Sequence, residues 1–360
     1  MGPVAHDATA DSGDLTEAVE RVARANGLDA VGIASAEPFA STRRDLEDRK
    51  AAGLHGGMHF TYGRPERSTD PQLALDGARA IVVGARSYRR AAPPRPDDGP
   101  QARVSRYSWH DHYGPLRDAL TAVASHLEAE GWRARVLVDD NALVDREAAY
   151  RAGLGWYGKN SNLLLPAHGS WFVLGSVVTD APLRVAAERA ADGCGTCTRC
   201  IPSCPTGAIV APGVIDARRC LAWLVQAPGP FPVEHREALG DRIYGCDECQ
   251  EVCPPNRLED RRDPPPAAHP GDEAWVPLLG VLSATDDELI ARHGRWYIPR
   301  RDPRYLRRNA LVALGNVGDA DDPDVVAAVA RWRADDDPML AEHAEWAAAR
   351  LGLADAAAPS

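Results

Sequence analysis

All eight cysteines of this 360-residue chain fall within one stretch of 60 residues. Their spacing is Cys194-x2-Cys197-x2-Cys200-x3-Cys204, then Cys220 alone, then Cys246-x2-Cys249-x3-Cys253. A proline follows the fourth cysteine and another follows the last. Thiolates spaced two residues apart can wrap one side of a shared ligand, so this stretch must fold around whatever its cysteines bind.

The first four cysteines have the spacing that bacterial two-cluster ferredoxins use for [4Fe–4S] clusters, where the fourth cysteine ligates the other cluster. We therefore expect two [4Fe–4S] clusters. Their ligand sets would be Cys194, Cys197, Cys200 and Cys253 for one cluster, and Cys204, Cys220, Cys246 and Cys249 for the other. Disulfides fit poorly, because clustered CxxC pairs in a chain without a signal peptide indicate metal sites. Zinc fits poorly too, because a site of four ligands has no use for the crossed pattern.

The remaining composition is typical of a multidomain cytoplasmic protein. A length of 360 residues suggests two or three domains. Residues 1–13 are polar and rich in alanine and glycine, unlike a signal peptide, and we expect a disordered tail there. No apolar run approaches the ~20 residues of a membrane helix. The formal net charge of −11 argues against wholesale nucleic-acid binding, so a polyanionic partner would need a local basic patch.

The predicted fold class is α+β and multidomain. Strand and helix patterns alternate through residues 14–185, which is typical of an α/β domain. A ferredoxin-like region follows at 186–262, and a proline-rich linker at 263–270 leads into a helical tail at 271–355. Within the tail, residues 309–318 match residues 343–352 at a spacing of 34, which suggests HEAT-like repeats. Two ordinary alanine-rich amphipathic helices are the alternative.

Expected elements in the first domain follow from hydrophobic periodicity. The predicted strands are 30–34, 79–85, 133–139 and 171–179, and the predicted helices start near 14 and span 42–52, 115–130 and 144–152.

Long motifs flank the cysteines in a fixed order. They read VDDNALVDR at 138–146, AGLGWYGKNS at 152–161, GSWFVLG at 169–175 and, after the cysteines, LRRNALVALGN at 306–316. In this order they closely resemble the epoxyqueuosine reductase family over residues 14–353. Reductive dehalogenases share the cobalamin and ferredoxin parts but would not carry the helical tail.

The resemblance implies a monomeric enzyme that reduces the epoxide of epoxyqueuosine to queuosine at the wobble position of tRNA. The first domain would bind cobalamin base-off, without a protein histidine on cobalt, which agrees with the absence of any Asp-x-His-x-x-Gly sequence. The two clusters would feed Co(I) cobalamin from a cellular electron donor. The implied partners are tRNA-Asp, tRNA-Asn, tRNA-His and tRNA-Tyr that bear epoxyqueuosine, with no membrane partner.

The proton donor of the family matches Asp139, which ends an expected strand, where sites of α/β proteins usually lie. Donation at neutral pH requires that burial against the corrin and base raise the pKa of Asp139. The alternative is that Asp139 caps the following helix, a role that Asp140 or Asn141 would fill equally well.

Further cofactor contacts are expected beside Asp139. Lys159, Asn160 and Ser161 lie in a glycine-rich loop and are candidates for bonding cobalamin, and Arg67 is a weaker candidate. The alternative for the loop is a turn that merely caps a helix.

Seven arginines and no lysine occur between Arg292 and Arg308, mixed with tryptophan and tyrosine. Arginine with aromatic residues suits phosphate contact and stacking on unpaired bases. The expected tRNA contacts are Arg295, Arg300, Arg301, Arg304, Arg307 and Arg308. The alternative is a solvated surface.

Two other functions remain open at this point. A cobalamin and iron–sulfur reductase of a small molecule would leave the basic tail without a role. A ferredoxin-type electron carrier with a scaffold tail would leave Asp139 and the first domain without a role.

Overall fold

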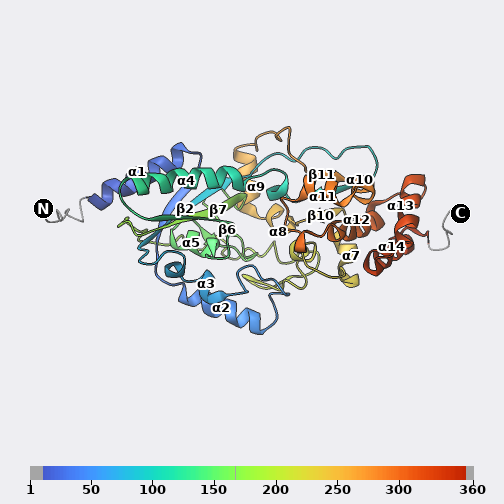
Figure 1. The fold of residues 1–360 in the computed structure, drawn as a ribbon, viewed down its shortest axis with the longest axis horizontal. Helices are drawn as coiled ribbons and strands as arrows, with labels where there is room; N and C mark the ends of the chain where they lie inside the picture. Colours follow the sequence, from blue (N-terminus) through green and yellow to red (C-terminus); the bar gives the residue numbers. More distant parts are fainter. Residues whose placement is uncertain (1–10, 167, 354–360) are drawn as a thin grey trace.

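The computed structural model describes residues 11–166 and 168–353, with α1 (Asp11–Ala25) and α14 (Pro338–Leu351) at opposite ends of its long axis (Figure 1). The first part of the chain builds a four-stranded sheet in the order β1-β2-β7-β4. The strands are β1 (Ala30–Ser35), β2 (Ala80–Ser87), β7 (Phe172–Thr179) and β4 (Ala134–Val138). Helices α1 and α4 (Tyr113–Ala129) cover one face, and α5 (Asp145–Arg151) covers the other.

The central strand β2 is buried on both faces because its side chains alternate between two cores. Val82 packs in the core that contains Leu120 of α4, whereas Ile81 packs in the core that contains Ala149 of α5. Successive side chains of a strand point to opposite faces. A strand covered on both sides therefore reads as a continuous apolar run, which is how this segment appears in the sequence.

All neighbouring strands of this sheet are antiparallel, which corrects the expected α/β arrangement. β1 pairs with β2, β2 with β7, and β4 with β7, each in opposite directions. Helices do alternate with strands along the sequence. An apolar pattern carries no information on strand direction, however, so the alternation alone did not distinguish the two arrangements.

Shorter elements complete the first part. Between β1 and β2 lie α2 (Ala40–Ala51), α3 (Pro65–Ser68) and the 3-10 helix η1 (Pro71–Leu73); between α5 and β7 lies the hairpin of β5 (Trp156–Tyr157) and β6 (Leu163–Leu164). Of the expected tail, residues 1–10 lie outside the described residues. Helix α1 begins at Asp11, inside the segment assigned to the tail.

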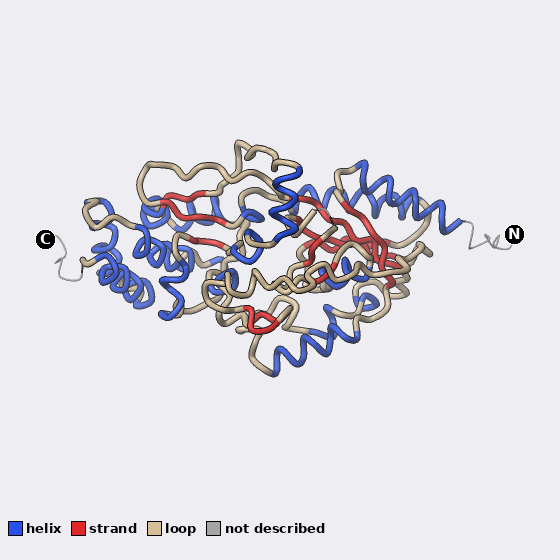
Figure 2. Tube along the Cα trace, turned by 180° about the vertical axis from the view of Figure 1, so that it is seen from behind, coloured by secondary structure: helices blue, strands red, loops and turns tan. Residues whose placement is uncertain are grey.

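A second sheet joins three segments that are far apart in the sequence. β3 (Gln101–Val104) lies between β10 (Arg242–Tyr244), which is parallel to it, and β11 (Trp275–Pro277), which is antiparallel. Figure 2 shows the larger sheet toward one end of the molecule and short strands toward the other. Residues 101–104 follow β2 in the chain but pair with the cluster region and the tail, so this sheet crosses the expected domain boundaries.

The cysteines occupy a region of loops and short elements near the middle of the long axis (Figure 1). Its elements are β8 (Ile209–Ala211), β9 (Val214–Ile215), α6 (Leu221–Leu224), α7 (Val233–Leu239), α8 (Glu248–Glu251) and α9 (Pro254–Arg262). All eight cysteines are free, so no disulfide crosslinks this region.

After β11 the tail is helical. Its elements are α10 (Leu278–Ser283), α11 (Asp286–His293), the 3-10 helix η3 (Pro299–Arg301), α12 (Arg304–Val317), α13 (Pro323–Arg333) and α14. Helices α12 and α14 contain the two matching segments and pack closely. A Cβ at Gly315 would lie 2.9 Å from Ala347 Cα, so only glycine permits this approach. Among the described residues, no helix is both long and apolar enough to cross a membrane.

A buried arginine joins the tail to the cluster region. Arg308 of α12 is 1% exposed, and its guanidinium donates hydrogen bonds to the carbonyl oxygens of Leu224, Val225, Ala227 and Gly229. Burial lowers the pKa of Arg308 to about 9, so the group still carries its charge at neutral pH. Four carbonyls at the end of α6 thus share one cation.

Replacing Arg308 with methionine should destabilise the protein, because it leaves these buried carbonyls without a donor. Each unpaired buried polar group costs about 1–3 kcal/mol, which corresponds to an apparent melting temperature at least about 5 °C lower. Differential scanning calorimetry of the cluster-loaded protein measures the change. Arg350→Met removes an exposed arginine 3.5 Å from Glu237 and should shift the temperature by only about 1 °C. Equal effects of the two variants would contradict the anchoring role.

Candidate functional site

Electrostatic contacts among the thiols form two neighbourhoods. Cys253 interacts with Cys194, Cys197 and Cys200, although it lies 53 positions after Cys200 in the sequence. Cys249 interacts with Cys220 and Cys246, and Cys220 interacts with Cys204. A further interaction between Cys249 and Cys200 brings the two neighbourhoods close together. The chain thus brings these thiols into two neighbourhoods, and their division into two cluster ligand sets stays a prediction.

Most of these thiols lie where a bare thiolate is costly. Burial raises the pKa of Cys246 to about 12, against the opposing charge of Arg242, and burial likewise raises the pKa of Cys253 to about 12. Cys204 differs: burial opposes the change, but hydrogen bonds from Thr206, Ala208 and Ile209 lower its pKa. Thiols of raised pKa become thiolates when a bound metal supplies the compensating positive charge.

The spacing of the thiols also bears on which metal they suit. A tetrahedral zinc site with Zn–S bonds of ~2.3 Å holds its sulfurs only about 3.8 Å apart. Across the described residues, no cysteine belongs to a group of three or more ligand atoms that all lie within 4.8 Å of one another. The sulfurs are therefore set too wide for a single ion, whereas a cubane cluster accommodates wider spacing.

The glycine-rich loop at 158–162 connects the first sheet to both cysteine groups. It forms the tip of the β5–β6 hairpin, where the Gly158 N–H donates to the Asn162 carbonyl at 2.8 Å. Lys159 Nζ donates to the Gly195 carbonyl at 2.7 Å, in the first cysteine loop. Asn160 Nδ2 donates to the Cys249 carbonyl at 3.1 Å, and Asn162 Nδ2 lies 3.9 Å from Cys249 Sγ. One short loop therefore contacts Gly195 in the first cysteine loop and Cys249 in the second group.

The contacts of this loop determine which of the expected cofactor-binding residues are available to a ligand. Lys159 and Asn160 already bond to the cysteine loops, so their side chains are committed there. Ser161 has a positive φ of 61° and a buried hydroxyl that has no hydrogen-bond partner among the described residues. The guanidinium of Arg67 also has no hydrogen-bond or ion-pair partner within that part of the chain, and the residue is half-buried. Ser161 and Arg67 remain available to a ligand.

Asp139 ends β4 in a strained backbone conformation, with a φ of 52° that non-glycine residues rarely adopt. It does not cap the next helix. Asp140 Oδ1 accepts from the Ala142 N–H at 2.8 Å, and the N-terminal flanking residue of α5 is Val144. Asp140 thus closes a turn that precedes α5 and does not cap the helix either, and the exposed carboxyl of Asp139 is left with no hydrogen-bond partner among the described residues.

The surroundings of Asp139 favour its protonated form. Desolvation by the surrounding protein raises the pKa of Asp139, the nearby charge of Asp140 raises it further, and the Arg117 guanidinium opposes both. Arg117 is held in place because its Nη2 donates to the Val138 carbonyl at 3.0 Å. Burial, with the charge of Asp139, also raises the pKa of Asp145 well above its ordinary value. Asp139 therefore lies in an acidic, partly desolvated environment that one arginine moderates.

A second loop brings the cluster region toward Asp139. The carbonyl of Gly56 accepts from Trp223 Nε1 at 2.8 Å, and the carbonyl of Leu54 accepts from the Ala217 N–H at 2.8 Å. Further along the same loop, the Thr61 N–H donates to Asn141 Oδ1 at 2.7 Å. Residues 53–64 therefore connect the segment after Asp139 to the chain around Cys220.

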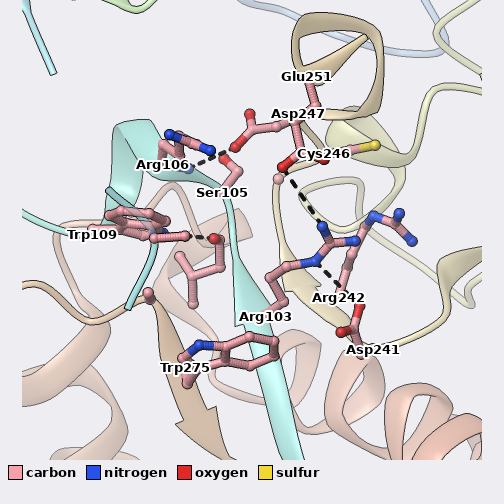
Figure 3. Close-up of a pocket in the computed structure, with 14 residues that line it drawn as sticks. Arg103, Ser105, Arg106, Trp109, Asp241, Arg242, Cys246, Asp247, Glu251 and Trp275 are labelled. Carbon is pink, nitrogen blue, oxygen red and sulfur yellow. Dashed lines mark hydrogen bonds and ion pairs between the residues drawn. The ribbon is translucent and has the colours of Figure 1, made fainter. Parts of the chain in front are cut away.

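Behind Cys246 lies a pocket of about 240 Å³ (Figure 3). Its charges are mutually compensated: Arg103 Nε lies 3.3 Å from Asp241 Oδ1, and Asp247 Oδ2 accepts from the Arg106 N–H at 2.7 Å. Figure 3 shows the sulfur of Cys246 pointing away from Trp275 on the pocket wall. We conclude that this pocket supports the loop of Cys246, since its polar side chains are held by neighbouring groups.

The arginines expected to contact tRNA fall into two groups in the structure, those held by other protein groups and those exposed to solvent. Arg308 is buried, which corrects its assignment to the surface, because its donors are used by carbonyls of the cluster region. Arg307 and Arg304 bind Asp286 at 2.6 Å and Asp337 at 3.4 Å, respectively. Arg295 is exposed but donates to the Trp109 carbonyl at 3.2 Å.

Two arginines of the patch differ from the rest. Arg300 and Arg301 are exposed, and each has a positive φ of 55°. Arg301 donates to the Gly294 carbonyl at 3.2 Å, and Arg300 has no side-chain partner in the described part of the chain. These two guanidinium groups are the most accessible of the expected set.

Sequence reasoning missed several residues that the fold places in the site. Asn162 was not singled out, although it follows Lys159 and Asn160 in the same motif. Arg117 and Asp145 carry no motif of their own, and only the folded chain brings them to Asp139.

Two family models match the chain. Residues 193–256 match a 4Fe-4S double cluster binding domain, and residues 68–140 match epoxyqueuosine reductase QueG, DUF1730. The first contains all eight cysteines, and the second ends just after Asp139.

Curated relatives match nearly the whole chain. An epoxyqueuosine reductase of Xanthomonas campestris pv. campestris is 35% identical over 351 residues, covering 95% of this chain and 98% of that protein. An epoxyqueuosine reductase of Bacillus anthracis is 33% identical over 350 residues, covering 95% and 90%.

Solved structures give the same result. A crystal structure of epoxyqueuosine reductase with a tRNA-Tyr epoxyqueuosine-modified stem loop has a TM-score of 0.85 at 30% identity, covering 94% of this chain and 90% of that one. The enzyme of Bacillus subtilis, solved with an aspartate-bearing catalytic loop swung out of the active site, has a TM-score of 0.84 at 30% identity with the same coverage.

Replacing Asn162 with leucine should make the reduction potential of the nearer cluster more negative. An N–H donor to a cluster sulfur stabilises the reduced form, and its loss, at about 0.5–1.5 kcal/mol, corresponds to roughly 20–60 mV. A redox titration followed by electron paramagnetic resonance measures the shift. Thr198→Val, an exposed change in the other cysteine loop, is the control. Equal potentials in the Asn162→Leu and wild-type proteins would contradict this role.

Proposed function

The chain belongs to the epoxyqueuosine reductase family, and we propose from this premise that it reduces epoxyqueuosine to queuosine at the wobble position of tRNA. The observation that carries the proposal is the match to a curated relative over 95% of this chain and 98% of that protein. The tRNA stem loop bound in the solved relative supports tRNA as the substrate.

Two [4Fe–4S] clusters are the proposed electron path. One would be held by Cys194, Cys197, Cys200 and Cys253, and the other by Cys204, Cys220, Cys246 and Cys249. The two thiol neighbourhoods, the raised pKa values of Cys249 and Cys253, and the match to a double cluster binding domain support this assignment. The electrostatic influence of the Cys200 thiol on Cys249 indicates that the two groups lie near each other, which supports transfer from one cluster to the other.

Cobalamin is the proposed cofactor of the first domain, and the residues beside Asp139 fit such a group. The buried hydroxyl of Ser161 lacks a partner among the described residues, and the Arg67 guanidinium is likewise unpaired there. Both suit the amide and phosphate groups of the cofactor, whereas Lys159 and Asn160 would act through the cluster loops. When bound, reduced cobalamin supplies electrons to the substrate carbon.

Opening the epoxide to an alkene consumes two electrons and two protons and releases water. The proposed role of Asp139 is to protonate the leaving oxygen. Its raised pKa keeps more of the carboxyl protonated at a given pH, and its lack of a hydrogen-bond partner among the described residues leaves the proton free to transfer. Arg117 positions the end of β4 and sets how tightly Asp139 holds that proton.

The proposed tRNA surface is the exposed part of the arginine patch, with Arg300 and Arg301 at its centre. Strained backbone at two consecutive residues supports a functional reason for their placement. Arg295, Arg304 and Arg307 would support this surface through their ion pairs and carbonyl contacts.

An anaerobic conversion assay tests the function. Cluster-loaded protein, a chemical reductant and tRNA carrying epoxyqueuosine are incubated with and without cobalamin, and the nucleosides are analysed by mass spectrometry. We expect loss of one oxygen mass only with cobalamin. No conversion with clusters and cobalamin both present would contradict the proposal.

Asp139→Asn should lower the single-turnover rate at least about 100-fold, because a positioned acid contributes that much to proton transfer. Cluster content and tRNA affinity should stay unchanged. Asp118→Asn, an exposed change on α4, is the matched control and should keep full activity. Full activity of Asp139→Asn would contradict the proton-donor role.

Arg117→Gln should extend activity to higher pH. The positive charge of Arg117 lowers the pKa of Asp139, so its loss raises that pKa and keeps the acid protonated as the pH increases. The alkaline limb of the pH–rate profile reports the shift. Arg135→Gln removes an arginine of β4 that donates to the Ala74 carbonyl and should leave the profile in place. If the alkaline limb of the Arg117→Gln profile moved to lower pH, the proposed effect of Arg117 on the pKa of Asp139 would be wrong.

Replacing both Arg300 and Arg301 with alanine should weaken tRNA binding about tenfold at low salt and reduce the slope of log affinity against log salt by about 1–2. Filter binding over a salt series measures both. The double variant Arg21→Ala with Arg44→Ala removes two exposed arginines elsewhere and should change neither. If the salt dependence of the variant lacking Arg300 and Arg301 is the same as that of the wild type, these two arginines do not contact the tRNA.

A further inference from the structure

Two histidines and one aspartate meet on the surface near the start of α4, apart from the cysteines and Asp139. One ligand atom from each of His110, His269 and Asp272 lies within 4.8 Å of the others. The imidazole rings of His110 and His269 have centroids 5.0 Å apart. Among the described residues, this is the one group of histidine, cysteine or carboxylate side chains close enough for a single ion.

A tight turn fixes two of the three groups. The Asp272 N–H donates to the His269 carbonyl at 2.9 Å, and the His269 N–H donates to Asp272 Oδ2 at 2.6 Å. Pro270 occupies the second position of this turn, where its fixed φ is favourable. The next residue, Glu273, donates its N–H to the Trp109 carbonyl at 2.9 Å, which docks the turn beside His110. The three groups are therefore held together by backbone contacts.

The carboxylate provides an independent sign of a missing cation. The side chain of Asp272 is 1% exposed, and its Oδ1 is buried without a hydrogen-bond partner among the described residues. Its Oδ2 accepts from His269 and lies 3.9 Å from Arg90 Nε. A buried carboxylate oxygen left unpaired is costly, and a cation within reach of the two imidazoles would satisfy it.

The space between the imidazoles is open. A Cβ built on Gly271 would lie 3.5 Å from His269 Nδ1 and 3.7 Å from His110 Nδ1, so both rings face the same point above this glycine. At present His269 Nδ1 accepts from the Gly271 N–H at 3.1 Å. An ion at this nitrogen would replace that contact, and an ion at the other nitrogen would require the ring to change tautomer.

We propose that His110, His269 and Asp272 bind one divalent transition-metal ion of the Zn²⁺ type, with water completing its coordination. Two imidazoles and a carboxylate suit such ions, because imidazole prefers them over Mg²⁺ or Ca²⁺. The ion crosslinks the linker that follows the cluster region to the turn before α4. Helix α4 carries Arg117, so the site stabilises the support of Asp139 and takes no part in the reaction.

Zinc binding to the cluster-loaded protein tests the proposal. Protein with verified iron and sulfide content is titrated with Zn²⁺ by isothermal calorimetry, and bound zinc and iron are counted by mass spectrometry after dialysis. We expect one zinc per chain with no loss of iron. Binding weaker than micromolar, or zinc gained only in step with lost iron, would overturn the proposal.

Variants locate the ion. His110→Ala, His269→Ala and Asp272→Asn should each weaken zinc binding at least about 100-fold, because each removes a direct ligand. His235→Ala, on α7, should bind zinc like the wild type. Circular dichroism and iron content confirm that each variant is folded. Wild-type affinity in the His110→Ala or His269→Ala protein would overturn the proposal.

Discussion

The return of Cys253 to the first three cysteines is the constraint on which the rest of the structure depends. It forces the segment at 246–253 to lie against the segment at 194–200, and the loop at 158–162 lies across both. Lys159 bonds to one cysteine loop, while Asn160 and Asn162 reach Cys249 in the other. The β5–β6 hairpin therefore contacts the cysteine loops of both groups, which agrees with the proposed delivery of electrons to a site beside Asp139.

Charged groups with fixed partners lie on both sides of the cysteines. On one side, Arg308 compensates four carbonyls at the end of α6 and fixes the helical tail to the cluster region. On the other, desolvation raises the pKa of Asp139 while Arg117 limits the rise. Each buried arginine or thiol is stable only because its partner is fixed nearby. The three parts of the chain consequently behave as one structure, with β3 crossing between them.

Much of this could be predicted from the sequence, and the failures have physical reasons. Periodicity located the strands, since β2 and β7 are apolar runs, but it could not give their antiparallel direction. The pairing of β3 with β10 and β11 depends on segments more than 130 residues apart, which no local pattern encodes. Counting arginines predicted a basic surface, yet a count does not show that Arg308 is buried. The backbone strain at Asp139 and the turn that Asp140 closes with the Ala142 N–H appear only in the folded chain.

The central claim is that the chain binds two clusters, each held by cysteines from both the first and the last part of the cysteine region. Mössbauer spectroscopy of protein loaded with ⁵⁷Fe tests this claim most directly. The measurement compares the wild type with a Cys253→Ser variant. Our account predicts the spectrum of two [4Fe–4S] clusters in the wild type, and in the variant an altered or absent signal for one cluster while the other is unchanged. A single cluster in the wild type, or simultaneous loss of both clusters in a variant that remains folded, would contradict it.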